Sequence, residues 1–81
     1  MNYHHIQVEQ EDNILIVRLH RPEKLNAVNY LMFKELIDVS RKVKRDHTIR
    51  AVILTGSGDN FSSGLDFKSI MKQKSQAIKL L

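Results

Sequence analysis

The chain has 81 residues, of which 42% are hydrophobic and 27% charged, with a formal net charge of +4 and no cysteine. This length allows one small domain, and the composition is that of a folded globular protein rather than a disordered tail. The lack of cysteine excludes disulfides and thiolate chemistry, and the modest positive charge suits an anionic ligand such as a phosphate without requiring nucleic acid. No apolar run is long enough to span a membrane and no signal peptide is recognisable, so we expect a cytoplasmic protein.

Two short strands are predicted at the start of the chain. Apolar and polar residues alternate from Ile6 to Glu9, which is typical of a half-exposed strand. The β-branched run 14–19 predicts a second strand with both faces partly covered, and the turn at 11–13 favours antiparallel pairing of the two. Pro22 interrupts the strand pattern, because proline has no N–H to donate to a sheet. We therefore expect the second strand to end before it.

The clearest helix follows. Asn29 is a suitable N-cap, and the apolar side chains recur every three or four residues on one face: Met32, Leu36, Val39 and Val43. Basic residues crowd its last turns, where they complement the negative end of the helix dipole: Arg41, Lys42, Lys44 and Arg45. A nucleic-acid patch is the alternative for this cluster, but a solvated helix end is favoured because no aromatic or second basic stripe accompanies it.

A third strand is predicted over residues 49–55. A helix between two strands indicates a crossover with the second and third strands parallel, and therefore an α/β architecture. A second helix is expected to begin near Asp66, with Phe67, Ile70 and Met71 on one side. Residues 77–81 are mostly apolar, and three strands with one clear helix cannot cover both faces of a sheet. We therefore expect the opening third of a larger domain.

Several familiar motifs do not fit the chain. Gly56 and Gly58 begin a G-x-G, but Phe61 stands where the dinucleotide fingerprint has its third glycine, and no Gly-Lys pair is present for a P-loop. The serines lie outside any G-x-S-x-G sequence and are expected to be turn residues. The histidines lack the spacing of metal ligands, so we expect no metal site: His4, His5, His20 and His47.

The segment Phe-Ser-Ser-Gly-Leu-Asp at 61–66 follows the third strand and has small residues at its centre. A backbone N–H can approach a ligand closely only where side chains are small, as they are at Ser62, Ser63 and Gly64. Such a turn, leading into a helix, can present donors to an oxygen that gains negative charge.

Three segments in this order resemble the crotonase, or enoyl-CoA hydratase/isomerase, superfamily. The sequence LHRPEKLNAVN at 19–29 is similar to the family's LxRPxKxNAxN segment, and RAVILTG at 50–56 looks like its central strand. FSSGLD at 61–66 is similar to its FxxGxDL signature, with Phe67 at the usual leucine or isoleucine position. The resemblance implies the N-terminal β-β-α-β-α portion of a crotonase-like (ClpP/crotonase) spiral fold, with residues 1–81 as a single partial domain.

The resemblance also implies an enzyme that binds acyl-coenzyme A thioesters and stabilises an enolate-like oxyanion with two peptide N–H groups. One donor maps onto the N–H of Leu65, directly after Gly64. Coenzyme A is part of the substrate, no permanently bound cofactor is implied, and Arg21 or Lys24 either offers a cation to a phosphate or is surface charge without a ligand. Substrate contacts are implied for Arg21, Lys24, Leu25, Ala27, Ser63, Gly64, Leu65, Asp66 and Phe67.

The family's second oxyanion donor and its acid/base carboxylates belong to segments that this sequence does not contain. Glu35 and Asp38 sit on the predicted helix, and Asp66 is better placed to cap the helix that follows it. We therefore expect the chain alone to be inactive and leave the reaction open between hydration, isomerisation, hydrolysis and dehalogenation. Two hypotheses remain: part of a hydratase/isomerase-type enzyme whose parent is a homotrimer or dimer of trimers, or a truncated non-catalytic interaction module.

Overall fold

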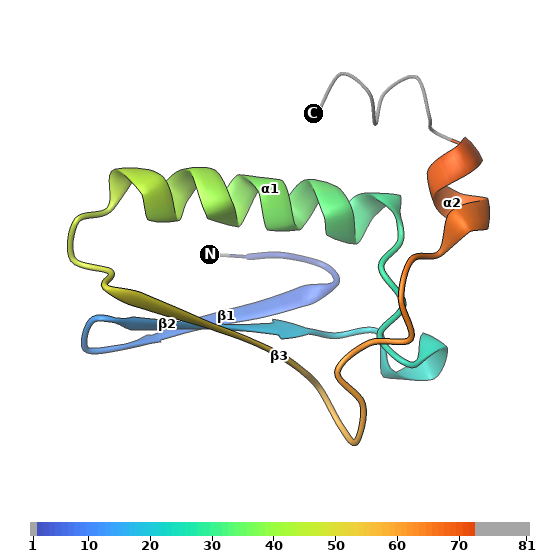
Figure 1. Ribbon diagram of the computed structural model, residues 1–81, viewed down its shortest axis with the longest axis horizontal. Coiled ribbons are helices and arrows are strands. Elements are labelled where there is room, and N and C mark those ends of the chain that lie inside the picture. The colour runs from blue at the N-terminus through green and yellow to red at the C-terminus, as the bar shows by residue number, and fades with distance from the viewer. Residues whose placement is uncertain (1, 73–81) are drawn as a thin grey trace.

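A three-stranded sheet with one long helix on one face forms the body of the chain (Figure 1). The structure is a computed structural model that describes residues 2–72, so the predictions for residues 73–81, including the apolar end, lie outside the described residues. The elements are β1 (Ile6–Glu11), β2 (Ile14–Leu19), the 3-10 helix η1 (Pro22–Lys24), α1 (Tyr30–Arg45), β3 (Ala51–Gly56) and α2 (Phe67–Lys72). This order confirms the predicted β-β-α-β-α arrangement.

The strands lie in the order β1-β2-β3. β1 pairs antiparallel with β2, and β2 pairs parallel with β3, as the sequence predicts. In the parallel register Leu19 lies opposite Gly56, so β2 and β3 end side by side at the same edge of the sheet. The loops that follow these two strands therefore start next to each other, although they are far apart in the sequence.

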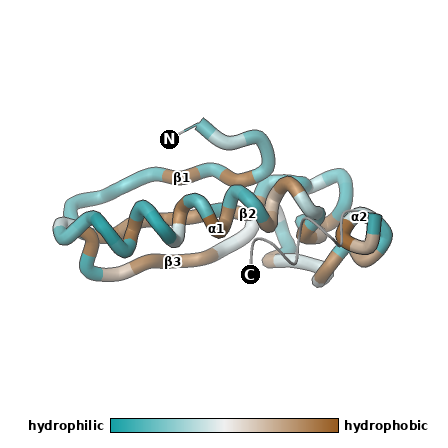
Figure 2. The backbone as a smooth tube through the Cα atoms, turned by 90° about the horizontal axis from the view of Figure 1, so that it is seen from above, coloured by the Kyte–Doolittle hydropathy of each residue, from teal (hydrophilic) through white to brown (hydrophobic). Residues whose placement is uncertain are grey.

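Helix α1 covers one face of the sheet with the predicted apolar stripe. Figure 2 shows α1 running along β2, with β1 on one side and β3 on the other. The Asn29 side chain caps the helix by accepting the Met32 N–H at 2.8 Å. The buried apolar core consists of Ile6, Leu15, Val17, Leu19, Met32 and Val39, with Leu36 and Val43 packed against it.

The prediction that both faces of β2 are partly covered is confirmed, although the two faces are covered unequally. Leu15, Val17 and Leu19 are buried beneath α1. On the opposite face Ile16 and Arg18 are half-buried and Ile14 is exposed. The strand therefore alternates between a buried and a half-covered face, because residues 2–72 place a long helix on one side of the sheet only.

Two strand boundaries also differ from the prediction. β1 continues to Glu11, which pairs with Ile14, so the connecting turn is shorter than expected. β3 begins at Ala51 rather than at residue 49, because the Ile49 N–H closes a turn onto the Asp46 carbonyl at 3.2 Å. Both differences come from local hydrogen bonds at the strand ends.

We expect the isolated chain to self-associate. Within residues 2–72 both β1 and β3 are sheet edges, and Val52, Ile53 and Leu54 on β3 are each about half exposed. Open edges with apolar side chains favour pairing with another chain. Sedimentation velocity should show species larger than a monomer, and thermal melting followed by circular dichroism should be broad. A sharp cooperative melt of a monomeric sample would contradict this expectation.

Candidate functional site

The segment after β2 has an unusual backbone. Helix η1 ends at Lys24, and the next two residues, Leu25 (φ 53°) and Asn26 (φ 57°), adopt the left-handed conformation. This conformation is costly for residues other than glycine and more tolerable for asparagine. Two main-chain hydrogen bonds close the loop, from the Asn26 N–H to the Arg21 carbonyl at 2.8 Å and from the Ala27 N–H to the Lys24 carbonyl at 3.0 Å. The neighbouring loop must supply further support to hold this conformation.

The Asn26 side chain provides that support. Asn26 is 1% exposed, and its amide nitrogen donates to the carbonyls of Ser57 at 2.9 Å and Asn60 at 2.8 Å. Its side-chain oxygen accepts the Arg21 N–H at 2.9 Å. One buried amide therefore joins the loop after β2 to the loop after β3, a role that the sequence pattern did not indicate.

Gly56 is needed where these loops meet. A Cβ atom at this position would lie 2.2 Å from the Asn60 carbonyl oxygen and 2.3 Å from the Phe61 carbonyl oxygen. Contacts this short with backbone atoms leave no room for any side chain. The glycine thus lets the chain turn back from the end of β3 onto Asn26.

Arg21 is buried, so its position differs from that of a free surface charge. Its guanidinium donates to the Ala27 carbonyl at 2.7 Å and lies 3.6 Å from the Asp66 carboxylate. The residue is 8% exposed. Arg21 therefore ties the first loop to the turn before α2, and Lys24, which is exposed, remains the better-placed of the two cations for a phosphate.

The turn 61–66 runs alongside the first loop. The Ser63 N–H donates to the Leu25 carbonyl at 3.0 Å, the Val28 N–H to the Gly64 carbonyl at 2.8 Å, and the Asp66 N–H to the Val28 carbonyl at 2.8 Å. The last two bonds form a parallel bridge between Val28 and Leu65. The structure therefore brings together the two segments that the sequence analysis singled out.

The N–H of Leu65 is left without an acceptor in the described part of the chain. It belongs to the same peptide unit as the Gly64 carbonyl, which faces Val28. No cis peptide is present among the described residues, and in a trans peptide the N–H points opposite to the C=O. The Leu65 N–H therefore points away from Val28, on a residue that is 53% exposed.

Gly64 is needed in this turn for its backbone conformation, and not because a side chain would clash with its neighbours. Its φ is 107°, a conformation that residues with a side chain rarely adopt, whereas a Cβ at this position would meet no atom within 4 Å. The prediction that Gly64 has a special backbone geometry is confirmed. The obstacle to a side chain is conformational strain.

Asp66 caps α2, as the sequence predicts. Its carboxylate accepts the Ser69 N–H at 3.2 Å and also faces Arg21. The Ser69 hydroxyl in turn accepts the Tyr30 N–H at 3.1 Å, which links the start of α2 to the start of α1. With these partners Asp66 has a structural role at the turn, so we do not assign it proton transfer.

The remaining predicted contact residues lie at the surface around this turn. Leu25 and Phe67 are 55% and 68% exposed, Ser63 and Lys24 are also exposed, and Ala27 is half-buried. Phe61, which is 55% exposed, adds a further apolar side chain to the same segment. The turn thus combines an unpaired N–H with exposed apolar side chains, which suits a ligand with a polar carbonyl and an apolar chain.

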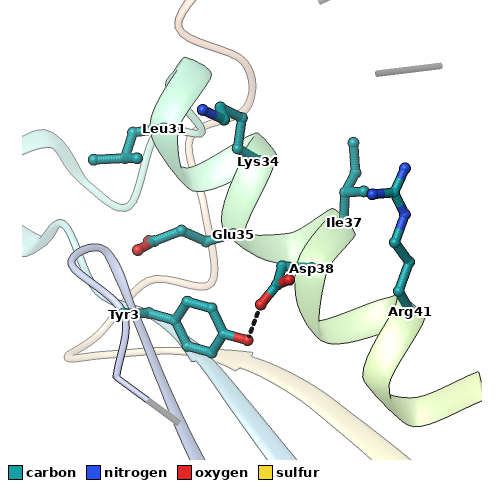
Figure 3. A pocket seen from close by; sticks show the side chains of 7 residues that line it. All are labelled: Tyr3, Leu31, Lys34, Glu35, Ile37, Asp38 and Arg41. Carbon is teal, nitrogen blue, oxygen red and sulfur yellow. Dashed lines mark hydrogen bonds between the residues drawn. The ribbon is translucent and has the colours of Figure 1, made fainter. Parts of the chain in front are cut away.

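A cavity of about 320 Å³ lies elsewhere, between α1 and the N-terminal segment that carries Tyr3 (Figure 3). The Tyr3 hydroxyl there donates to Asp38 at 2.6 Å, and burial together with this bond raises the pKa of Tyr3. Glu35, which is 6% exposed, accepts the N–H groups of His4 at 2.5 Å and His5 at 2.8 Å. These bonds hold the start of the chain against α1. We therefore assign the polar groups of this cavity a structural role and not a ligand-binding one.

Residues 2–72 contain neither a metal-ligand cluster nor a membrane-spanning helix. The described residues contain no group of three His, Cys, Asp or Glu side chains that could hold a metal ion. None of the helices in this range is long and apolar enough to cross a membrane.

Known proteins are similar to this chain in both sequence and fold. The family described as Enoyl-CoA hydratase/isomerase matches residues 9–80. The mitochondrial Delta(3,5)-Delta(2,4)-dienoyl-CoA isomerase of Mus musculus is 38% identical over 76 residues, 93% of this chain and 23% of the isomerase. The hydroxycinnamoyl-CoA hydratase-lyase of Pseudomonas fluorescens is 37% identical over 68 residues, 84% of this chain and 25% of that enzyme.

The fold agrees with the sequence match. The crystal structure of a probable enoyl-CoA hydratase/isomerase from Mycobacterium abscessus superposes with a TM-score of 0.89 at 29% identity, covering 98% of this chain and 30% of the other. The chain spans about a quarter of the length of the two curated relatives. Since the family match takes in nearly all of the sequence and the crotonase fold is shared, this chain belongs to the enoyl-CoA hydratase/isomerase family.

Proposed function

We propose that this chain binds an acyl-coenzyme A thioester and supplies one oxyanion donor, the N–H of Leu65, to the thioester oxygen. The observation that carries the proposal is the unpaired, outward-pointing N–H in a turn whose other N–H groups at 63, 64 and 66 are hydrogen-bonded. Such a donor is held in place before the substrate arrives. It therefore needs little reorganisation when the oxygen gains charge.

The chemistry follows from where the charge develops. Both relatives act on coenzyme A thioesters according to their names, one as an isomerase and one as a hydratase-lyase. In reactions of this kind the thioester oxygen becomes negative when electrons move from the acyl chain into the carbonyl. A donor that binds this oxygen more strongly in the transition state than in the ground state lowers the barrier.

The nucleotide end of coenzyme A is assigned to the first loop. Lys24 is exposed and its side chain has no partner in the described part of the chain, so its charge is available to a phosphate. Leu25, next to it, is exposed and offers apolar contact. Because Ser63 is bonded to Leu25 through the main chain, the two ends of the substrate would lie on adjoining segments.

Gly64→Val tests the oxyanion donor in the whole protein, meaning the complete polypeptide to which these residues belong. Valine cannot readily adopt the φ of 107° at this position, so the Leu65 N–H should be displaced. We expect kcat/KM with crotonyl-CoA to fall about a hundredfold or more, the usual effect of losing one oxyanion donor. Ser57→Ala, which removes a hydroxyl bonded to His20, should change it little. Near-normal turnover by a folded Gly64→Val variant would refute the assignment.

Lys24→Ala tests the phosphate contact. An exposed ion pair contributes modestly, so we expect the Kd for coenzyme A to rise about three- to fivefold, with a weaker dependence on salt. Lys44→Ala, at an exposed position in the last turn of α1, is the matched control and should leave the Kd unchanged. Equal effects of the two substitutions would show that only overall charge matters. Isothermal titration calorimetry at two salt concentrations gives the measurement.

The isolated chain should not turn over crotonyl-CoA above background. The carboxylate nearest to Leu65 in sequence, Asp66, is occupied as a helix cap and faces Arg21, and Glu35 is buried against the main chain of His4 and His5. General acid/base catalysis needs a carboxylate free to reach the substrate. Absorbance of the thioester conjugation gives the assay, and detectable hydration by the purified chain would show that the chemistry is misassigned.

A further inference from the structure

The Ser62 hydroxyl lies between the two loops of the candidate site. It donates to the Asn26 carbonyl at 2.8 Å and accepts the N–H of Gly64 at 3.0 Å. Ser62 is half-buried. Both bonds go to main-chain atoms, so the hydroxyl acts on the backbone of the turn and not on another side chain.

Asn26 gives the serine a fixed point of attachment. Its side chain is buried and bonded to the carbonyls of Ser57 and Asn60, and its own N–H is bonded to Arg21. Its carbonyl oxygen is therefore held by a residue with little freedom to move. A hydroxyl anchored to that oxygen can in turn hold the N–H of Gly64.

Holding the Gly64 N–H has a direct consequence for Leu65. The bond to Ser62 fixes the peptide unit before Gly64, and the bond from the Val28 N–H to the Gly64 carbonyl fixes the peptide unit after it. Glycine has wide freedom in φ and ψ, and these two bonds remove that freedom at Gly64. The second unit carries the Leu65 N–H, and its direction is therefore held by the Val28 bond together with the Ser62 bond on the other side of Gly64.

We propose that Ser62 is a positioning residue for the oxyanion donor: its hydroxyl engages the Gly64 N–H and thereby limits rotation at Gly64, so that the Leu65 N–H stays aimed at the thioester oxygen. The proposal rests on the proposed function of Leu65. Without the hydroxyl, the Gly64 N–H loses its acceptor, and the glycine is freer to rotate.

The experiment measures how strongly the whole protein polarises a bound thioester. Crotonyl-CoA is the probe, and the infrared stretching frequency of its thioester carbonyl is compared between the free and bound forms. We expect binding to lower this frequency in the wild type, because a fixed N–H donor withdraws electron density from the C=O bond. We expect Ser62→Ala to lose most of that shift and Ser62→Thr, which keeps the hydroxyl, to restore it.

Two controls separate positioning from a general loss of structure. Ser57→Ala removes a hydroxyl from the neighbouring loop and should keep the full shift. Coenzyme A itself has no thioester carbonyl, so its Kd should be the same for Ser62→Ala and the wild type. A full shift in Ser62→Ala would overturn the inference, as would a parallel loss of coenzyme A affinity, since that would indicate a structural role. Absence of a shift in the wild type would instead refute the oxyanion function of Leu65, on which the inference rests.

Discussion

The buried amide of Asn26 is the interaction on which the candidate site depends. It satisfies the carbonyls of Ser57 and Asn60 and takes the N–H of Arg21, so three main-chain groups from two loops converge on one side chain. Leaving a buried polar group without a partner costs about 1–3 kcal/mol. An apolar residue at position 26 would leave all of these main-chain groups without their side-chain partner. The same bonds stabilise the left-handed backbone of Leu25 and Asn26, which would otherwise be unfavourable.

The topology of the sheet places this amide where it can act. Because β2 and β3 are parallel and Leu19 lies opposite Gly56, the loop after each strand leaves the sheet at the same edge. Ligands of open α/β sheets commonly bind beyond the carboxyl ends of parallel strands. In the turn 63–66 the N–H groups of Ser63, Gly64 and Asp66 are hydrogen-bonded within the protein, whereas the exposed N–H of Leu65 between them is available for a ligand.

Sequence patterns predicted the parts of this structure that depend on periodicity and local chemistry. The helix stripe from Met32 to Val43, the Asn29 cap, the Asp66 cap and the parallel pairing of β2 with β3 all follow from residue type and spacing. The roles of Asn26 and Ser62 did not, because their partners are carbonyl and N–H groups whose positions exist only once both loops are folded. Arg21 and Glu35 were likewise read as charges on a loop and a helix, whereas packing buries both against main-chain atoms.

The site is also connected to the apolar core through the backbone. Leu19 is 2% exposed at the end of β2, and its carbonyl accepts the Ser57 N–H at 2.9 Å. The Ser57 carbonyl then accepts the Asn26 amide, and the Asn26 carbonyl accepts the Ser62 hydroxyl. Burial of one leucine side chain therefore fixes the first link in a series of hydrogen bonds that ends at the Gly64 N–H. The hydrophobic effect supplies the free energy that holds the sheet edge, and directional hydrogen bonds convert that fixed edge into the orientation of a single peptide group.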